Sequence, residues 1–146
     1  MPTALSADPT TLANRLRPAL LRLNRELRRE LHSLGVTGGQ VSLLIKVQKE
    51  PGIGIRELAL WERMSTPGMS KYVARLESAR LVRRRELEDR RRVGLELTPE
   101  GSRVLSSVKR RRTAWLAERL RGLSPAELDA VDAAVEPLLK LLEVGA

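Results

Sequence analysis

The sequence predicts a mainly α-helical fold with one small β-hairpin near the middle of the chain. Apolar residues recur at spacings of three and four over most of the 146 residues, which is typical of amphipathic helices. Short polar residues that can cap a helix stand before several of these stretches. Only residues 93–97, with Val93, Leu95 and Leu97 in alternation, have the pattern of a half-buried strand.

The first helix is expected to begin at Asp8, a capping carboxylate followed by Pro9 at the first helical position. Leucines then recur every three or four residues up to position 31. Pro18 lies inside this pattern, so we expect it to kink the helix or to mark its true start. Gly35 should end the helix.

A second helix is expected to run from a capping box at Thr37 and Gln40 to about Lys49. A turn around one short extended piece at 51–54 and a short helix at 55–62 follow. The side chains expected to point inward from this short helix are Leu58 and Ala59.

Ser65 is expected to cap the next helix, residues 65–80, with Pro67 in its first turn. Its apolar face is Met69, Val73 and Leu76. Residues 83–87 are the natural antiparallel partner of the strand at 93–97, with 88–92 at the tip. A helix-turn-helix followed by a basic hairpin is a winged-helix arrangement.

Thr98 should cap a long helix, and a capping box at Ser124 and Glu127 should start the last one. Pro137 is expected to bend this last helix. Its apolar residues recur at spacings of three and four, which suits packing against another helix. They are Leu128, Val131, Val135, Leu138 and Leu142.

The composition limits the possible functions. The formal net charge is +9, but residues 122–146 alone carry one Lys and five acidic residues. A basic body with clustered arginines favours nucleic acid as partner, and an anionic membrane second. The chain has no Cys and one His, which excludes disulfides and makes metal, cofactor and acid–base sites unexpected. Three aromatic residues are too few for a reader of single strands.

The helix at 65–80 presents small and basic side chains on the face opposite its apolar one. The small ones permit a close approach to a DNA groove, and the basic ones can donate to guanine or phosphate. For Ser65, Thr66 and Pro67, a good helix start is the alternative explanation. The candidate DNA-binding residues here are Ser65, Thr66, Pro67, Ser70, Lys71 and Arg75.

The hairpin supplies the second set of candidates, which are Arg84, Asp89, Arg90, Arg91 and Arg92. An arginine on a thin hairpin can enter the narrow minor groove, where the negative potential is enhanced. A carboxylate beside it can hold a neighbouring guanidinium in place. The alternative is an exposed charge run that contributes little.

The chain resembles the MarR family of bacterial winged-helix regulators. The resemblance rests on the spacing of short motifs over nearly the whole chain: Asp89-x-Arg91, Leu97-Thr98-x-x-Gly101, Leu58-Ala59, Ser65-x-Pro67, Arg75-Leu76-Glu77 and Leu81-Val82-x-Arg84. The chain departs from the family pattern at Glu62 and Arg63, where the family often has an apolar residue and a glycine. The turn before the reading helix is therefore expected to differ.

The resemblance implies a homodimer whose terminal helices intertwine. On this basis the expected segments are 1–34, an N-terminal dimerisation helix, 35–98, the DNA-binding lobe, and 99–146, the C-terminal dimerisation helices. Residues 65–80 would enter the major groove, and Arg91 would reach the minor groove with Asp89 orienting it. Many family members are repressors released by small aromatic or phenolic effectors.

Three functions compete. The first is a sequence-specific regulator of double-stranded DNA, a repressor that acts as a homodimer on a pseudo-palindromic operator and responds to a small effector of that class. The second is a non-specific architectural DNA-binding protein, because basic wings also bind without selectivity. An enzyme is disfavoured because one His and no Cys leave little with which to build a site. No membrane segment or signal pattern is evident, so a cytoplasmic protein is expected.

Overall fold

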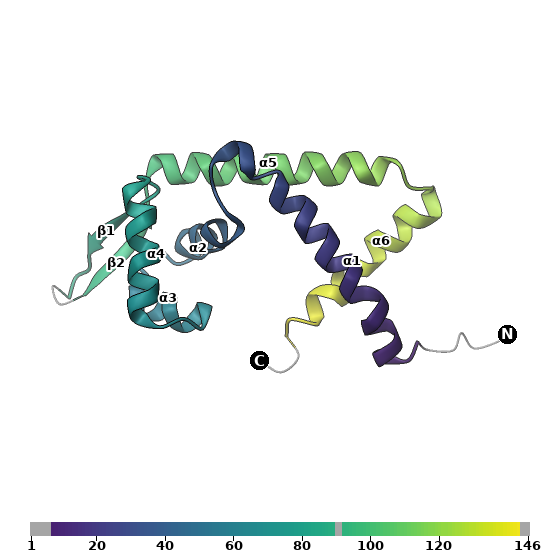
Figure 1. Ribbon diagram of the computed structural model, residues 1–146, viewed down its shortest axis with the longest axis horizontal. Coiled ribbons are helices and arrows are strands. Elements are labelled where there is room, and N and C mark those ends of the chain that lie inside the picture. The colour runs from purple at the N-terminus through teal and green to yellow at the C-terminus, as the bar shows by residue number, and fades with distance from the viewer. Residues whose placement is uncertain (1–6, 90–91, 144–146) are drawn as a thin grey trace. The chain divides into compact units, whose positions relative to one another are not determined.

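The computed structural model describes residues 7–89 and 92–143, and it divides into two compact units, residues 1–111 and 112–146. The elements in chain order are drawn in Figure 1. They are α1 (Pro9–Arg29), the 3₁₀ turn η1 (His32–Leu34), α2 (Gly38–Lys49), α3 (Ile55–Glu62), α4 (Thr66–Ser78), β1 (Val82–Glu86), β2 (Val93–Leu97), α5 (Pro99–Arg121) and α6 (Pro125–Lys140). The prediction of a mainly helical winged helix-turn-helix is confirmed.

The predicted helix starts are confirmed by their hydrogen bonds. The Asp8 carboxylate accepts from the Thr11 backbone N–H at 3.0 Å. The capping box of α2 is complete, because Thr37 and Gln40 each accept from the other's backbone N–H. The capping box of α6 is complete in the same way. Each of these bonds satisfies a backbone donor that the first turn of a helix leaves without an intrahelical partner.

The end of the first helix differs from the prediction. Pro18 lies inside α1, so it does not mark the helix start. The α-helix ends at Arg29, and a 3₁₀ turn follows it before Gly35 closes that turn in the left-handed conformation, at φ 71°. The leucine pattern continues through Leu31, which is fully buried, so the spacing alone did not reveal the change of helix type.

The hydrophobic core of the first unit lies among α2, α3, α4, the hairpin and the first part of α5. The predicted inward residues Leu58, Ala59, Met69, Val73 and Leu76 are all at most 2% exposed. They share one cluster with Leu31, Leu43, Leu44, Val47, Leu81, Val82 and Leu95. Side chains of this kind contribute about 1.5–3 kcal/mol each when fully buried, so α4 is firmly seated on its apolar face.

The hairpin is antiparallel, with Val82 opposite Leu97 and Glu86 opposite Val93. Ile53, from the predicted extended piece before α3, bridges to Leu95 on the other side of β2. The predicted alternation holds only in part, because Leu95 is buried whereas Val93 is 45% exposed. Val93 lies at the outer end of the strand, beyond the reach of the core.

The start of α5 is fastened to the turn that leads from α4 into β1. The Thr98 hydroxyl donates to the Arg80 carbonyl at 2.6 Å and accepts from the Gly101 N–H at 3.0 Å. The Thr98 N–H donates to the Leu81 carbonyl at 3.1 Å. Gly101 faces the same carbonyl so closely that an added Cβ would lie 2.1 Å from the oxygen. The motif residues Thr98 and Gly101 are therefore a structural junction.

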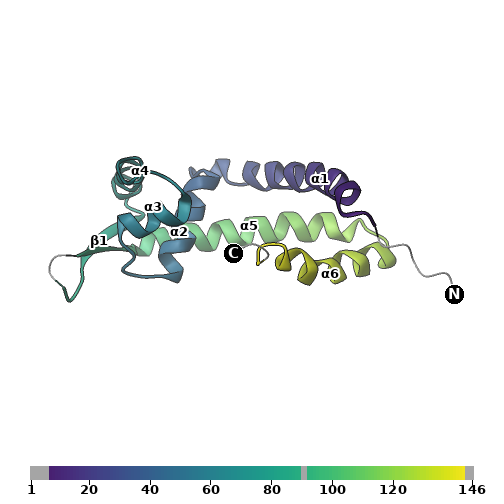
Figure 2. The ribbon, with the colours of Figure 1, turned by 90° about the horizontal axis from the view of Figure 1, so that it is seen from below.

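The second unit contains the end of α5 and α6, which turns back after Gly122 (Figure 2). Described by itself, α6 has no buried residue. Its predicted apolar stripe is accordingly open, with Leu128, Val131 and Val135 between 42% and 48% exposed. In the part of the chain that the structure describes, no helix combines the length and the apolar character that a membrane crossing requires.

Candidate nucleic-acid interface

Helix α4 presents a polar face opposite its buried one. Lys71 and Arg75 are exposed, as are Thr66 and Pro67 in the first turn. Ser70 is half-buried. Because these positions alternate at helical spacing with the buried Met69, Val73 and Leu76, the core fixes the direction in which Lys71 and Arg75 point. Of the six predicted residues of this helix, these four are therefore exposed to solvent and Ser70 is half-buried.

Ser65, the sixth of these residues, has a structural task. Its hydroxyl accepts from the Gly68 N–H at 3.1 Å and caps the helix. The sequence left open whether this residue contacts DNA or only starts the helix. The cap is observed, and a phosphate contact stays a prediction.

The turn between α3 and α4 is where the chain departs from the family pattern. Arg63 ends α3 in the left-handed conformation, at φ 56° and ψ 42°. Residues other than glycine adopt the left-handed conformation at a cost in free energy, so glycine is the favoured residue at this position. Glu62 accepts a hydrogen bond from the Ser42 hydroxyl of α2 at 3.1 Å, which ties the turn to the preceding helix.

The stem of the wing carries three successive arginines, and each has an ion-pair partner. Arg84 Nε lies 3.1 Å from Glu77 Oε1 of α4. Arg83 Nε lies 2.6 Å from Glu96 Oε1 of β2, and Arg85 Nη1 lies 3.7 Å from the second oxygen of the same carboxylate. The predicted DNA residue Arg84 therefore braces β1 against α4, and its contact with DNA stays a prediction.

Sequence reasoning did not single out Glu77 and Glu96 as site residues. For Glu96 a signal was available, because the pairing of the strands at 83–87 and 93–97 sets an acidic residue opposite a row of arginines. The partner of Arg84 is Glu77 of α4. Helix and strand periodicity could not predict this ion pair, because it joins two different elements.

The tip of the wing is described in part. Asp89 is exposed, and its backbone carbonyl accepts from the Arg92 N–H at 2.8 Å. Arg90 and Arg91, the predicted minor-groove arginine among them, lie outside the described residues. Their roles stay predictions.

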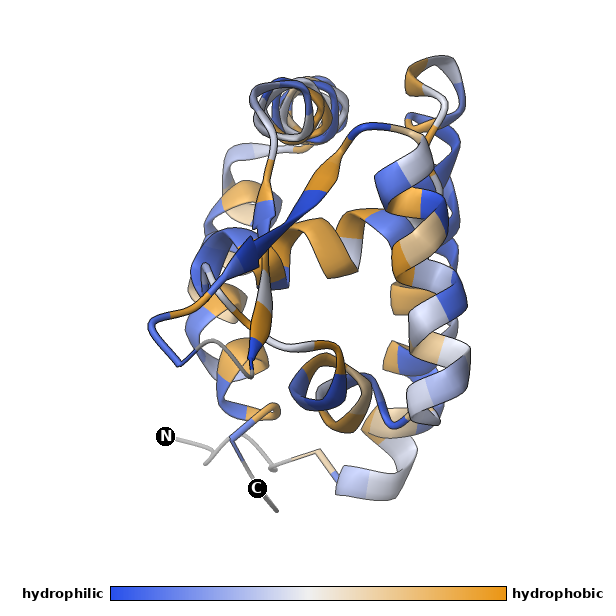
Figure 3. Cartoon of the chain, turned by 90° about the vertical axis from the view of Figure 1, so that its left-hand side faces the viewer, coloured by the Kyte–Doolittle hydropathy of each residue, from blue (hydrophilic) through white to orange (hydrophobic). Residues whose placement is uncertain are grey.

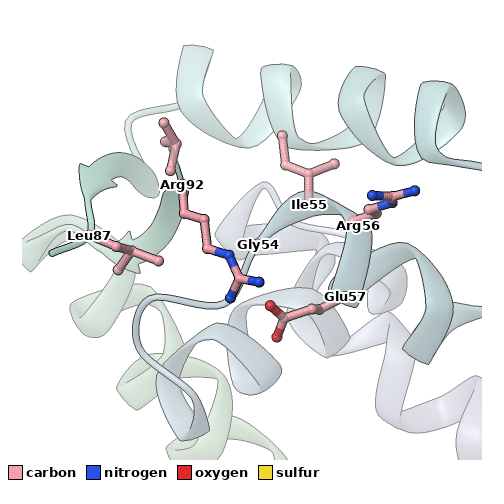
Figure 4. Close-up of a pocket in the computed structure, with 7 residues that line it drawn as sticks. Gly54, Ile55, Arg56, Glu57, Leu87 and Arg92 are labelled. Atoms are coloured by element: carbon pink, nitrogen blue, oxygen red, sulfur yellow. The ribbon is translucent and has the colours of Figure 1, made fainter. Parts of the chain in front are cut away.

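Arg92 extends beside the start of α3, as Figure 4 shows. It lines a cavity of about 390 Å³ together with Leu87 of the wing and Gly54 and Glu57 at the start of α3. The predicted phosphate contact of this residue is untested. In the described structure, its side chain lies between the outer end of the hairpin and the start of α3.

One strand of the hairpin is coloured mostly as hydrophilic in Figure 3. This strand is β1, which carries the three successive arginines. Lys71 and Arg75 of α4 are further exposed basic residues of this part of the chain. Exposed basic residues of this kind suit the phosphate backbone of a duplex. Among the described residues, no group of His, Cys, Asp and Glu is arranged to hold a metal ion.

The chain is similar to known helix-turn-helix transcriptional regulators. The HTH-type transcriptional regulator Mb0904 of Mycobacterium bovis is 32% identical over 133 residues, which cover 90% of this chain and 93% of the relative. A structure named as the MarR family transcription regulator SP03579 is 26% identical, with a TM-score of 0.69, and covers 94% of this chain and 93% of its own. The chain belongs to the MarR family of DNA-binding transcriptional regulators.

Two further structures share the fold of this MarR family chain. A MarR family protein from Bacillus stearothermophilus has a TM-score of 0.79 at 23% identity and covers 94% of this chain and 99% of its own. The S. aureus MepR F27L mutant bound to an oligodeoxyribonucleotide has a TM-score of 0.68 at 20% identity and covers 90% and 97%. No family model matches the chain. The named relatives are transcriptional regulators, which is consistent with a non-enzymatic MarR family protein.

Proposed function

We propose that this MarR family protein is a ligand-responsive repressor that binds a pseudo-palindromic operator as a homodimer. The observation that carries the proposal is the way in which the core orients α4. Its apolar face is fully buried, while Lys71 and Arg75 stand exposed on the other face. A fixed helix with donor side chains can read base edges in the major groove. The oligodeoxyribonucleotide bound to the structurally similar MepR mutant supports DNA as the partner.

Besides Ser65, which caps α4, each candidate residue has a place in this proposal. Thr66, Pro67 and Ser70 permit close approach of α4, and Lys71 and Arg75 read or contact the major groove. Arg91 enters the minor groove with Asp89 beside it, and Arg90 and Arg92 contact phosphates. Arg84 aligns the wing with α4 through Glu77. Binding to chromosomal DNA places the protein in the cytoplasm.

The homodimer is supported by the apolar surface that the described chain leaves open. Exposed large hydrophobic residues follow α6 and also α1, where Leu12, Leu20 and Leu23 are 44–46% exposed. Apolar surface of this kind marks an interaction site, and a second copy of the chain is the partner that the family resemblance implies. In this proposal, the segments 1–34 and 99–146 form the dimer and 35–98 binds DNA.

The decisive experiment compares operator and random duplex of the same length at one fixed salt concentration. A sequence-specific regulator should bind the operator about 10³-fold or more tightly. Lys71→Ala and Arg75→Ala should each lower operator affinity about tenfold or more per half-site and relax selectivity there, because a good base contact contributes ~1–3 kcal/mol. Arg17→Ala removes the same charge from the exposed surface of α1 and serves as the control. A ratio near unity for the unmodified protein would instead indicate an architectural DNA-binding protein.

The dimer has its own test in α6. Val135, 48% exposed in the single chain, is replaced by Lys, which would place a charge in the apolar interface, so the variant should sediment as a monomer and lose operator binding. Ala133→Lys introduces the same charge beside Asp129 and Glu136, on the polar side of the helix, and should stay dimeric. A dimeric Val135→Lys variant would remove α6 from the interface.

The effector is assigned from the family resemblance. A panel of benzoic and phenolic acids is titrated into the operator complex. Release of the DNA at concentrations that also raise the melting temperature of the free protein is the expected result. A panel that changes neither the complex nor the melting temperature would contradict regulation by this class of effector.

A further inference from the structure

The carboxylate of Glu96 is shared by two arginines of the wing stem. Arg83 is directly opposite Glu96 in the β ladder, and its Nε lies 2.6 Å from Oε1. Arg85 is opposite Gly94, which has no side chain, and its guanidinium lies diagonally near Glu96, 3.7 Å from Oε2. Long side chains on diagonal positions of a hairpin are within reach of each other. One acidic residue therefore holds two cations of the same face.

These pairs lie at the protein surface. The side chains of Arg83 and Arg85 are 60% and 53% exposed, while that of Glu96 is 25% exposed. Ion pairs with this exposure are weak and are exchanged easily. A phosphate group that approached the stem would thus compete with Glu96 for the two guanidinium groups.

The competition matters because sequence-independent DNA affinity depends on how many phosphates the protein neutralises. In a non-specific complex the lobe adopts many positions on the duplex, so any available cation finds a phosphate. In the operator complex, base contacts by α4 fix the lobe in one position. A carboxylate that occupies stem arginines therefore weakens non-specific complexes more than the specific one.

We propose that Glu96 is a specificity-determining residue, which holds Arg83 and Arg85 and so limits binding to random DNA. The inference rests on the sequence-specific binding proposed above. Glu96 belongs to β2 and lies neither on the proposed major-groove helix nor at the tip. In this proposal, Glu96 acts through the two arginines and does not touch a base.

The test is Glu96→Gln, which keeps the shape of the side chain and removes its charge. Affinities for operator and for random duplex are measured over a series of salt concentrations. We expect random-duplex affinity to rise about tenfold near physiological salt, with a log–log salt slope steeper by about 1.8 to 3.6 for two wings that each gain one or two phosphate contacts. Operator affinity should rise less, so the specificity ratio falls.

Glu86→Gln is the matched control. Glu86 is an exposed residue of β1, the strand that carries Arg83 and Arg85, and no ion pair of the described residues involves it. The Glu86→Gln substitution removes one negative charge from the hairpin, as Glu96→Gln does, but it releases no arginine. In the Glu96→Gln background, Arg83→Gln together with Arg85→Gln should return the salt slope to that of the unmodified protein.

The outcomes separate the two proposals. If the unmodified protein does not prefer its operator, the proposed function fails whatever Glu96 does. If it does prefer the operator, but Glu96→Gln binds random DNA like the unmodified protein or like Glu86→Gln, the role of Glu96 is refuted while the proposed function stands. A matching rise for operator and random duplex also refutes it, because the ratio would then be unchanged.

Discussion

Replacing Gly101 by alanine should destabilise the lobe, although alanine is the better helix former. The added Cβ would lie 2.1 Å from the Leu81 carbonyl oxygen, so α5 or the carbonyl must move. Overpacking of this kind costs ~1–3 kcal/mol. The movement also strains the hydrogen bonds that Thr98 makes with Arg80 and Leu81, which contribute about 1 kcal/mol each.

Against these losses stands the helix propensity of alanine, which favours the variant by about 1 kcal/mol. The net destabilisation is therefore about 2 kcal/mol, which corresponds to a fall in melting temperature of ~4–8 °C for a chain of this size. The assay is thermal and urea unfolding followed by circular dichroism.

Gly122→Ala is the control, because its added Cβ would meet the Arg119 carbonyl at an ordinary 3.4 Å. Its stability should change little. A Gly101→Ala variant as stable as the unmodified protein would show that the junction between α5 and Leu81 yields without cost, and the reasoning would be wrong.

Two further predictions concern the backbone and pH. Arg63→Gly should stabilise the protein by about 0.5–1 kcal/mol, because glycine relieves the strain of the left-handed conformation at φ 56°. Arg63→Ala should bring no such gain, and urea unfolding of both variants measures the difference. Equal stabilities of the two variants would show that this turn is unstrained. The hydrogen bond from the Ser124 backbone N–H lowers the pKa of Glu127, so its capping contribution is present above the ordinary carboxyl pKa and is lost as pH falls through the lower folded pKa. Glu127→Gln keeps a capping acceptor without titrating, so the stability advantage of the unmodified protein over this variant should shrink on acidification, and a constant difference in melting temperature would refute the assignment.

Local rules of the chain predicted much of this fold. The caps at Asp8, Thr37, Ser65 and Ser124 depend on residues three positions apart, a distance that a sequence displays directly. The burial of Met69, Val73 and Leu76 follows from helical spacing in the same way. The outward direction of Lys71 and Arg75 was predictable for that reason.

Contacts between elements were not predictable in this way. The pairing of Arg84 with Glu77 joins a strand to a helix, and the contact of Gly101 with Leu81 joins the start of α5 to the turn before β1, 20 residues earlier. Neither contact produces a periodic pattern in the sequence. Arg63 shows a second limit, because its left-handed conformation is imposed by the tight turn between α3 and α4 in spite of its side chain. The roles of Arg90 and Arg91 stay predictions, since they lie outside the described residues.

The junction of Thr98 with Arg80 and Leu81 closes the hairpin at its base. The buried residue Val82 lies at this same end and the buried Leu95 at the middle of β2, so the buried contacts of the wing lie away from its tip. Exposed polar loop tips are the sites that tolerate insertion best, and doubling a loop's length costs only about 0.6 kcal/mol. Residues 87–92 can therefore change in length or sequence while the rest of the hairpin keeps its fold.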